Sequence, residues 1–260
     1  MYKKPMISAY TPVKNEAHFI KLYIEHLKDK VDEIFLLDTG STDGTLDEIE
    51  KYRVMYPDLI KLDRYDTGGV SYTWEEGKVR NYGLSKLKNK WVISLDADEM
   101  FSDNFMDTLN LSQPRVFGFP WITMWKDLST VRVSVPTDNR WYDNTVIKLF
   151  HKDYAQWQEK GNHAPLWFDH RLLSNYKNVY AYHFHYALFD RCKANDNRLF
   201  DLGQIDYWSK DIIPPVKDED FDYLLTINHE YTLKTIKWNE PLPKTIYDLG
   251  LASRQSPTTS

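Results

Sequence analysis

Two spacings of apolar residues alternate along the first 110 residues of the chain. Apolar runs of strand length occur at residues 6–10, 33–37, 59–62 and 91–95. Between these runs, apolar residues recur three or four positions apart, which is the spacing of a helix with one buried face. The helical spacing is found at Phe19, Ile20, Tyr23, Ile24 and Leu27, at Leu46, Ile49 and Tyr52, and at Val79, Tyr82, Leu84 and Leu87. Strands alternating with helices predict an α/β fold with a mostly parallel central sheet and helices on both faces.

The pattern changes after Pro114. Segments 117–125, 130–136 and 146–150 are predicted to be strands, in part antiparallel, and the first of them is rich in aromatic residues. Residues 187–210 have helical spacing. The proline-containing tail ends in SRQSPTTS, a polar sequence that we expect to be disordered.

The composition is that of an ordinary globular protein, with 42% apolar and 27% charged residues. The net charge of −5 gives no electrostatic footprint for a nucleic acid. Cys192 is the single cysteine, which excludes an internal disulfide and a cysteine-built zinc site. No run of about 18 apolar residues is present, so no integral membrane segment is predicted. We expect a cytoplasmic protein, with any membrane association peripheral.

Polar residues follow several of the predicted strands. Thr11 and Pro12 end the first strand, Asp38 ends the second, and the sequence DADE at residues 96–99 follows the strand at 91–95. In an open α/β sheet, ligands bind beyond the carboxyl ends of the strands. Because the ends of parallel strands share one edge of a sheet, Asp38 and Asp96 are expected to face the same cleft.

Two features of the sequence DTGSTDGT at residues 38–45 need an explanation: its turn-forming residues and the carboxylate of Asp38. A tight turn in which Ser41, Thr42 or Asp43 caps a helix starting near Thr45 accounts for most of it. That turn leaves Asp38 unexplained, since Asp38 lies at the strand end. A carboxylate there can accept hydrogen bonds from a ribose hydroxyl or a base N–H.

The sequence DADE places two carboxylates, Asp96 and Asp98, one residue apart at a strand end. Hard divalent cations prefer oxygen ligands, and Mg²⁺ usually takes one or two carboxylates with phosphate and water. A solvated acidic loop is the alternative. The apolar strand before it and Asp38 on the same edge favour a metal site.

Four ordered motifs carry a family resemblance: PVKNEAHFI, VDEIFLLDTGSTDGT, VRNYGLSK and WVISLDADE. Together they resemble the N-terminal half of family-2 glycosyltransferases of the Rossmann-like GT-A fold. The resemblance is close over residues 5–100 and looser up to His185. It implies a nucleotide-sugar-binding half at 1–112, an aromatic-rich acceptor-side half at 113–212 and a C-terminal extension at 213–260.

The resemblance also assigns roles to individual residues. It implies a divalent metal, Mn²⁺ or Mg²⁺, held by Asp96, Asp98 and the late histidine His185. His183 would share the strand face of His185. The residues implied to bind the donor nucleotide are Thr11, Pro12, Asn15, Glu16, Asp38, Arg80, Asn81 and Asp96.

The catalytic base is the point where the sequence departs from the family. Many relatives have a His-Glu pair after an RLF strand, whereas here Lys148-Leu149-Phe150 is followed by His163 and Ala164. The candidates for the base that accepts the acceptor's proton are Asp143, His163 and Asp169.

The sequence therefore predicts metal-dependent, inverting transfer of a sugar from a nucleoside-diphosphate sugar, with UDP-sugars favoured, to an acceptor hydroxyl. The acceptor is a glycan, a protein, a small molecule or a modified nucleic-acid base. A catalytically impaired sugar-nucleotide-binding or glycan-binding module is the main alternative. A haloacid-dehalogenase-like phosphatase is disfavoured because Met100 stands where that family has Thr or Val. A nucleotidyltransferase is disfavoured because its glycine- and arginine-rich phosphate loop is missing.

Overall fold

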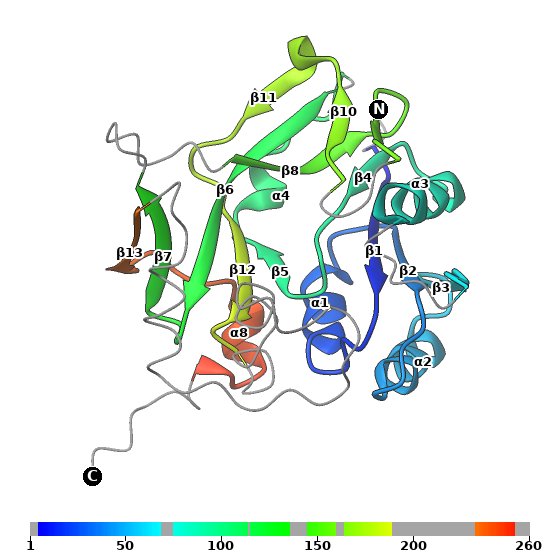
Figure 1. The fold of residues 1–260 in the computed structure, drawn as a ribbon, viewed down its shortest axis with the longest axis horizontal. Helices are drawn as coiled ribbons and strands as arrows, with labels where there is room; N and C mark the ends of the chain where they lie inside the picture. Colours follow the sequence, from blue (N-terminus) through cyan, green and yellow to red (C-terminus); the bar gives the residue numbers. More distant parts are fainter. Residues whose placement is uncertain are drawn as a thin grey trace.

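The computed structural model describes residues 5–68, 75–113, 115–135, 145–159, 164–188 and 232–252. Its central sheet has a parallel half, in which neighbouring strands run in the order β4-β1-β2-β3 (Figure 1). These strands are β1 (Ile7–Val13), β2 (Glu33–Asp38), β3 (Ile60–Arg64) and β4 (Trp91–Ile93). The predicted parallel sheet is confirmed, and the carboxyl ends of these strands lie at one edge.

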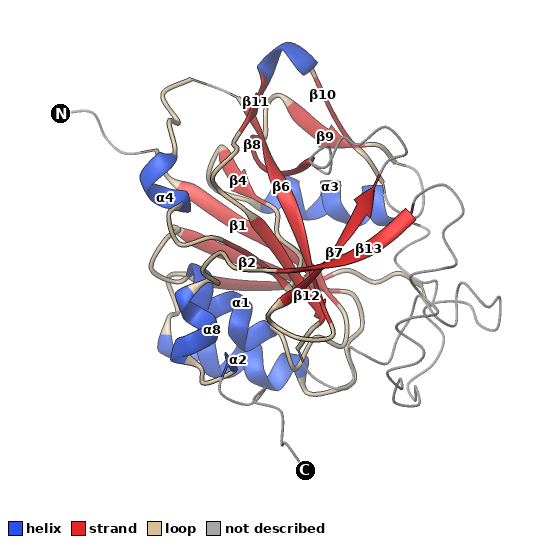
Figure 2. Cartoon of the chain, turned by 90° about the vertical axis from the view of Figure 1, so that its left-hand side faces the viewer, coloured by secondary structure: helices blue, strands red, loops and turns tan. Residues whose placement is uncertain are grey.

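Helices cover both faces of the parallel strands, as Figure 2 shows. Alternate residues of β2 point to the two faces of the sheet. Ile34 and Leu36 pack with α1 and α2 on one face, while Phe35 and Leu37 pack with α3 on the other. The helices are α1 (Ile20–Leu27), α2 (Thr45–Met55) and α3 (Glu76–Lys86). Because successive side chains of a strand point to opposite faces, an unbroken apolar run in the sequence becomes a sheet buried on both sides.

The sheet continues without a break into the second half of the chain. Strand β8 (Thr145–His151) pairs antiparallel with β4, and β6 (Val116–Trp125) pairs antiparallel with β8. Strands β7 (Thr130–Val135) and β13 (Thr232–Lys237) complete that side. The strands predicted after Pro114 are confirmed. Most of the predicted 187–210 helix and the last eight residues of the tail lie outside the described residues.

Strand β12 (Ala181–Tyr186) brings the late histidines to the DADE segment. It runs parallel to β6 and antiparallel to β5 (Glu99–Phe101), with His183 opposite Glu99. The backbone N–H of Phe184 donates to the carbonyl of Asp98 at 2.9 Å. Residues about 85 positions apart in the sequence are therefore neighbours at the sheet edge.

The remaining elements are short. They are α4 (Phe105–Thr108), β9 (Ala155–Trp157), β10 (Leu166–Phe168), the 3₁₀ turn η2 (His170–Leu172), β11 (Leu173–Asn175) and α8 (Lys244–Asp248). Strands β9 and β10 form a separate antiparallel pair. This pair approaches α3 closely at Gly77, where an added Cβ would lie 1.8 Å from the carbonyl oxygen of Gln158. No helix in the described ranges is long and apolar enough to cross a membrane.

The segment that contains α8 closes the core behind β12. Leu242 and Ile246 pack against Tyr182 and Phe184, and the Tyr182 hydroxyl donates to the carbonyl of Pro241 at 3.0 Å. Tyr182 and Phe184 alternate with His183 and His185 along the strand. One face of β12 is therefore anchored in the core while the other carries the histidines.

His26 joins α1, β5 and α8. Its Nε2 accepts the backbone N–H of Phe101 at 3.2 Å, so Nδ1 carries the proton and donates to Thr245 Oγ1 at 3.3 Å. Burial lowers the pKa of His26 well below its ordinary 6.5, and Lys30 lowers it further. The folded protein therefore keeps this imidazole neutral.

We expect His26 to make the protein less stable in mild acid. Below pH 6.5 the unfolded chain binds a proton at His26 that the folded chain does not, so the free energy of unfolding falls as the pH falls. Urea denaturation at pH 7.5 and pH 5.5 measures this loss. In His26→Gln, which has no titrating ring, the loss should be smaller by about 1 kcal/mol. An identical pH dependence in both proteins would contradict the assignment.

Candidate active site

The loops after β1 and β2 are clamped together by their own polar side chains. Four hydrogen bonds join them: Asn15 N to Ser41 Oγ (3.0 Å), Glu16 N to Thr45 Oγ1 (2.7 Å), Ala17 N to Asp43 Oδ2 (3.1 Å) and Thr42 N to Asn15 Oδ1 (2.8 Å). Asn15 adopts a left-handed backbone conformation, with φ of 58°. Many of the polar side chains of VKNE and DTGSTDGT therefore hold the two loops together by hydrogen bonds.

Helix α2 does not begin with the side-chain cap that the sequence predicted. The N-cap position of α2 is Gly44, with φ of 97°, rather than Ser41, Thr42 or Asp43. Glycine takes this place because its left-handed backbone carries no steric cost there. Asp43 still contributes, since its Oδ1 accepts the backbone N–H of Thr45 at 3.0 Å.

Asp38 is buried at the end of β2 and shapes the turn that follows. Its carboxylate accepts the backbone N–H groups of Gly40 at 3.2 Å and Ser41 at 3.0 Å. An ionised carboxylate has about four acceptor positions, so these two bonds leave capacity for a ligand. Thr11 and Pro12 lie one strand away, paired in register with Leu36 and Leu37 of β2.

Arg80 and Asn81, the RN pair, point to different partners. The Arg80 guanidinium, 10% exposed, binds Glu76 Oε1 through Nε at 2.8 Å and Asp96 Oδ1 through Nη2 at 2.9 Å. The Asn81 amide instead exchanges two hydrogen bonds with the backbone of Trp157, at 2.8 and 2.9 Å. Arg80 therefore reaches the DADE segment, whereas Asn81 anchors β9 on α3.

Lys148 and Glu99 form a buried ion pair behind Asp96, at 2.5 Å. Glu99 also accepts the backbone N–H of Asp96 at 2.8 Å, and the Lys148 ammonium lies 3.8 Å from Asp96 Oδ2. Burial raises the pKa of Glu99 and acts to lower that of Lys148, but Glu99 and Asp96 keep the pKa of Lys148 above its usual value. Burial acts to raise the pKa of Asp96, and Arg80 and Lys148 outweigh it.

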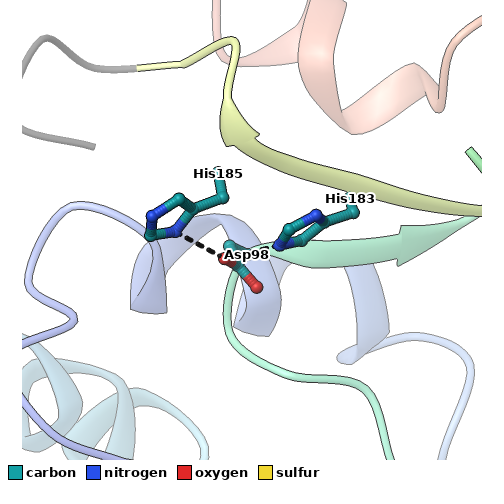
Figure 3. Close-up of side chains that lie close together, drawn as sticks. All are labelled: Asp98, His183 and His185. Carbon is teal, nitrogen blue, oxygen red and sulfur yellow. Dashed lines mark hydrogen bonds and ion pairs between the residues drawn. The ribbon is translucent and has the colours of Figure 1, made fainter. Parts of the chain in front are cut away.

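Asp98 meets both histidines of β12, as Figure 3 shows. Its Oδ2 lies 3.0 Å from His185 Nδ1 and 3.3 Å from His183 Nε2. Burial acts to raise the pKa of Asp98, but His183 and then His185 hold it well below its usual value. Among the described residues, Asp98, His183 and His185 are the group whose ligand atoms all lie within 4.8 Å of one another.

These three residues fit a divalent ion. One carboxylate and two imidazoles are donor groups that transition metals accept, with bonds of about 2.0–2.2 Å. Adjacent ligands around such an ion stand about 3.0–3.5 Å apart, which matches the measured Asp98–histidine separations. Asp96, the other predicted ligand, is turned toward Arg80 and Lys148 instead.

Of the three candidate bases, only Asp169 lies within the described residues. Asp143 and His163 lie outside the described residues. Asp169 follows β10, which runs away from the Trp157 end of β9, and its carboxylate pairs with exposed Arg171 at 2.5 Å. Ala164, which replaces the family glutamate, donates its backbone N–H to Glu76 Oε2 at 3.1 Å.

Glu76, Glu99 and Lys148 were not among the residues predicted for the site, and His183 was predicted only as the less favoured member of the histidine pair. Lys148 had a signal, since it occupies the basic position of the RLF-like strand, and His183 had one in its two-residue spacing from His185. Glu76 and Glu99 had none, because their role depends on which cations the fold brings to them.

Comparison with known proteins finds similarity in the N-terminal part of the chain. The family model described as glycosyl transferase family 2 matches residues 8–109 of the chain. The resemblance seen in the motifs is thereby confirmed at the level of the family.

The relatives are similar over less than half of this chain. The minor teichoic acid biosynthesis protein GgaA of Bacillus subtilis is 28% identical over 113 residues, which are 40% of this chain and 24% of that protein. The glycosyltransferase SunS of Bacillus phage SPbeta is 31% identical over 99 residues, 38% of this chain and 21% of that protein. The chain thus aligns with about a quarter or less of either relative.

Among solved structures, residues 1–349 of S. aureus TarS in complex with UDP are 16% identical. The alignment covers 85% of this chain and 69% of that chain, with a TM-score of 0.47.

Lys148→Met should destabilise the protein by about 3–5 kcal/mol, because it leaves buried Glu99 without its cation. Chemical denaturation measures the change. Lys90→Met is the matched control: Lys90 pairs with Asp153 on the surface, and its loss should cost less than about 1 kcal/mol. The double variant Lys148→Met/Glu99→Gln should recover part of the loss. Equal, small effects of Lys148→Met and Lys90→Met would contradict the proposed burial of charge.

Proposed function

We propose that the chain is a glycosyltransferase that moves a sugar from a nucleoside-diphosphate sugar to an acceptor hydroxyl with the help of a divalent metal. The observation that carries this proposal is the convergence of Asp98, His183 and His185 at the edge where Asp38 ends β2 and Asp96 follows β4. The glycosyl transferase family 2 match over residues 8–109 supports it, as do relatives named glycosyltransferases.

The charge balance of the site supports a role for a metal. Among the described residues, six charged side chains form this group, of which Glu76, Asp96, Asp98 and Glu99 are acidic, and Arg80 and Lys148 are basic. Acidic groups exceed basic ones by two, which would repel a donor diphosphate. A divalent cation bound by Asp98, His183 and His185 would neutralise this excess and act as a Lewis acid for the departing diphosphate.

The protein's own groups then orient the donor. Asp38 would accept a hydrogen bond from the nucleoside, within loops already fixed by their mutual clamp. Asp96, held by Arg80, would face the ribose. Fixing these groups before binding lowers the entropy cost of placing the donor. The family resemblance adds inversion at the anomeric carbon and favours a UDP-sugar as donor.

Residues 1–112 would supply most of the donor site, and residues 113–212 the histidines and the acceptor side. The two parts differ in their proposed role and are not separate folding units, since one central sheet runs through both of them. The acceptor's proton would pass to a base from Asp143, His163 or Asp169. The ion pair with Arg171 and the direction of β10 make Asp169 the least suitable of these.

A donor-binding module without turnover is the second candidate, because Ala164 stands where the family has glutamate. Incubation with UDP-, GDP- and dTDP-sugars, with and without Mn²⁺, separates the two. Metal-dependent donor hydrolysis or transfer supports the enzyme. Tight donor binding without any turnover supports the module.

Asp98→Asn should lower turnover at saturating donor by at least about 100-fold. Mutating a residue that only hydrogen-bonds to a metal ligand already lowers metal affinity or activity by about 10–100-fold, and Asp98 is proposed to be a ligand itself. The amide keeps the shape of the side chain, so the fold should survive, and circular dichroism checks this. Asp107→Asn, at an exposed aspartate, is the control. Turnover of Asp98→Asn within a few-fold of the parent would remove the metal from the mechanism.

Removal of the base should lower kcat by about 10²–10⁴-fold and leave donor binding intact. We expect one of Asp143→Asn and His163→Ala to show this result, and Asp169→Asn to retain near-parent turnover. Steady-state kinetics with calorimetric donor binding test all three. If none lowers kcat more than a few-fold, the base is a different residue.

A further inference from the structure

A cavity of about 520 Å³ opens beside the start of β6, away from the proposed metal ligands. Strands β11 and β12 both run parallel to β6, but they pair with different parts of it (Figure 1). Ser174 of β11 lies opposite Phe117, and both residues line the cavity. His183 of β12 lies opposite Thr123, which is six positions further along β6, a distance of about 20 Å in a strand. The cavity is therefore separate from the candidate active site.

The chemistry of the cavity walls favours an anionic ligand. None of the described side chains that line the cavity is acidic, and Arg115 is the charged one. Within the part of the chain that the structure describes, the half-buried Arg115 guanidinium has no hydrogen-bond or ion-pair partner. A guanidinium presents five N–H donors and no acceptor, so a phosphate or carboxylate is its natural partner. The other polar side chains of the walls are neutral amides and hydroxyls, from Asn110, Ser112, Gln113, Ser174 and Asn175.

The backbone that carries these groups is held in place. The carbonyl of Arg115 accepts the backbone N–H of His151 at 3.0 Å, directly before β6 begins. Asn175 is paired in register with Gly118 of β6. A Cβ added to Gly118 would lie 2.4 Å from Asn175 Oδ1, so the Asn175 amide lies directly over the glycine. Polar groups that are positioned before a ligand arrives lower the entropy cost of binding.

Two aromatic rings, Phe117 and Tyr176, also line the cavity. Their centroids are 5.4 Å apart, and the Tyr176 hydroxyl donates to the carbonyl of Thr108 at 3.1 Å, which fixes the tyrosine ring. An apolar ring surface surrounded by a few fixed polar groups is the usual composition of a small-molecule site. The C–H groups of a sugar ring pack on such a surface, while its hydroxyls bind the neighbouring amides.

We propose that this cavity binds a saccharide that carries a phosphate or carboxylate group. Arg115 holds the anionic group through two parallel N–H···O bonds. Ser174 and Asn175 bind the sugar hydroxyls, and Tyr176 packs against the sugar ring. The volume of about 520 Å³ lies within the range of small-molecule sites, about 300–1,000 Å³. Because the cavity is distant from the proposed metal, its ligand is held there and not transformed.

Titration of the full chain with glucose 6-phosphate, glucuronate, glucose and inorganic phosphate, followed by amide NMR, tests this proposal. At least one of the two anionic sugars should bind about tenfold or more tightly than glucose and than inorganic phosphate. The amide signals of Arg115, Ser174 and Asn175 should move, and EDTA should leave the binding unchanged. Inorganic phosphate that binds as tightly as both anionic sugars would reduce the cavity to an anion site and overturn the saccharide assignment. No binding of either sugar, or shifts confined to the candidate active site, would overturn the proposal.

Variants test the roles of the lining residues. Arg115→Gln should weaken binding of the anionic sugar by at least about tenfold. Arg64→Gln, at an exposed arginine of β3, is the matched control and should bind as the parent does. Asn175→Ala should weaken the anionic sugar several-fold and leave inorganic phosphate unchanged, because the amide contacts the sugar. Parent-like binding of the anionic sugar by Arg115→Gln would overturn the proposal.

This inference and the proposed function fail separately. Asp98→Asn should bind the anionic sugar as the parent does, since the cavity contains no proposed metal ligand. A chain without any transfer activity that still binds the anionic sugar at Arg115 would support the cavity and contradict the proposed function. Loss of that binding in Asp98→Asn would place the sugar at the candidate active site and overturn the inference.

Discussion

The site depends on the double attachment of Asp98 to β12. The carbonyl of Asp98 accepts the N–H of Phe184, and its carboxylate meets His183 and His185. A strand exposes alternate residues on one face, so the hydrogen-bonded backbone also aims both rings at the carboxylate. On the other face, Tyr182 and Phe184 are buried against Leu242 and Ile246. The packing of the core thereby fixes the geometry of the three proposed ligands.

Electrostatics fixes the rest of the site. Arg80 and Lys148 hold Asp96 and Glu99, so the DADE segment is ordered by cations that belong to the protein. Buried charges are stable only when they are paired and hydrogen-bonded, which explains why each cation reaches two carboxylates. Asp98 is the carboxylate left to the histidines and to the proposed ion.

Much of the fold could be predicted from the sequence because its signals are local. The apolar run of residues 33–37 and the helical spacing of Ile20, Tyr23 and Ile24 reappear as β2 and α1, with bounds shifted by a residue or so. The sequence also predicted that Asp38 and the DADE segment share one edge of the sheet, since parallel strands end at the same edge.

Tertiary contacts account for what could not be predicted. Asn81 was expected to bind the donor, but its side-chain amide hydrogen-bonds to the backbone of Trp157, a residue 76 positions away. Glu76 and Lys148 acquire roles only through Arg80 and Asp96, which other elements bring to them. In the loops, Ser41 and Asp43 bind backbone groups of the neighbouring loop, a use that their sequence motif does not distinguish from ligand binding.

The central claim is that one edge of the sheet binds a metal and a nucleotide together. A crystal of the full chain grown with Mn²⁺ and UDP, measured at a wavelength where manganese scatters anomalously, tests it most directly. The account predicts an anomalous peak bonded to Asp98 and to the diphosphate, with the nucleoside beside Asp38. A peak away from Asp98, or a nucleotide bound at another part of the molecule, would contradict it.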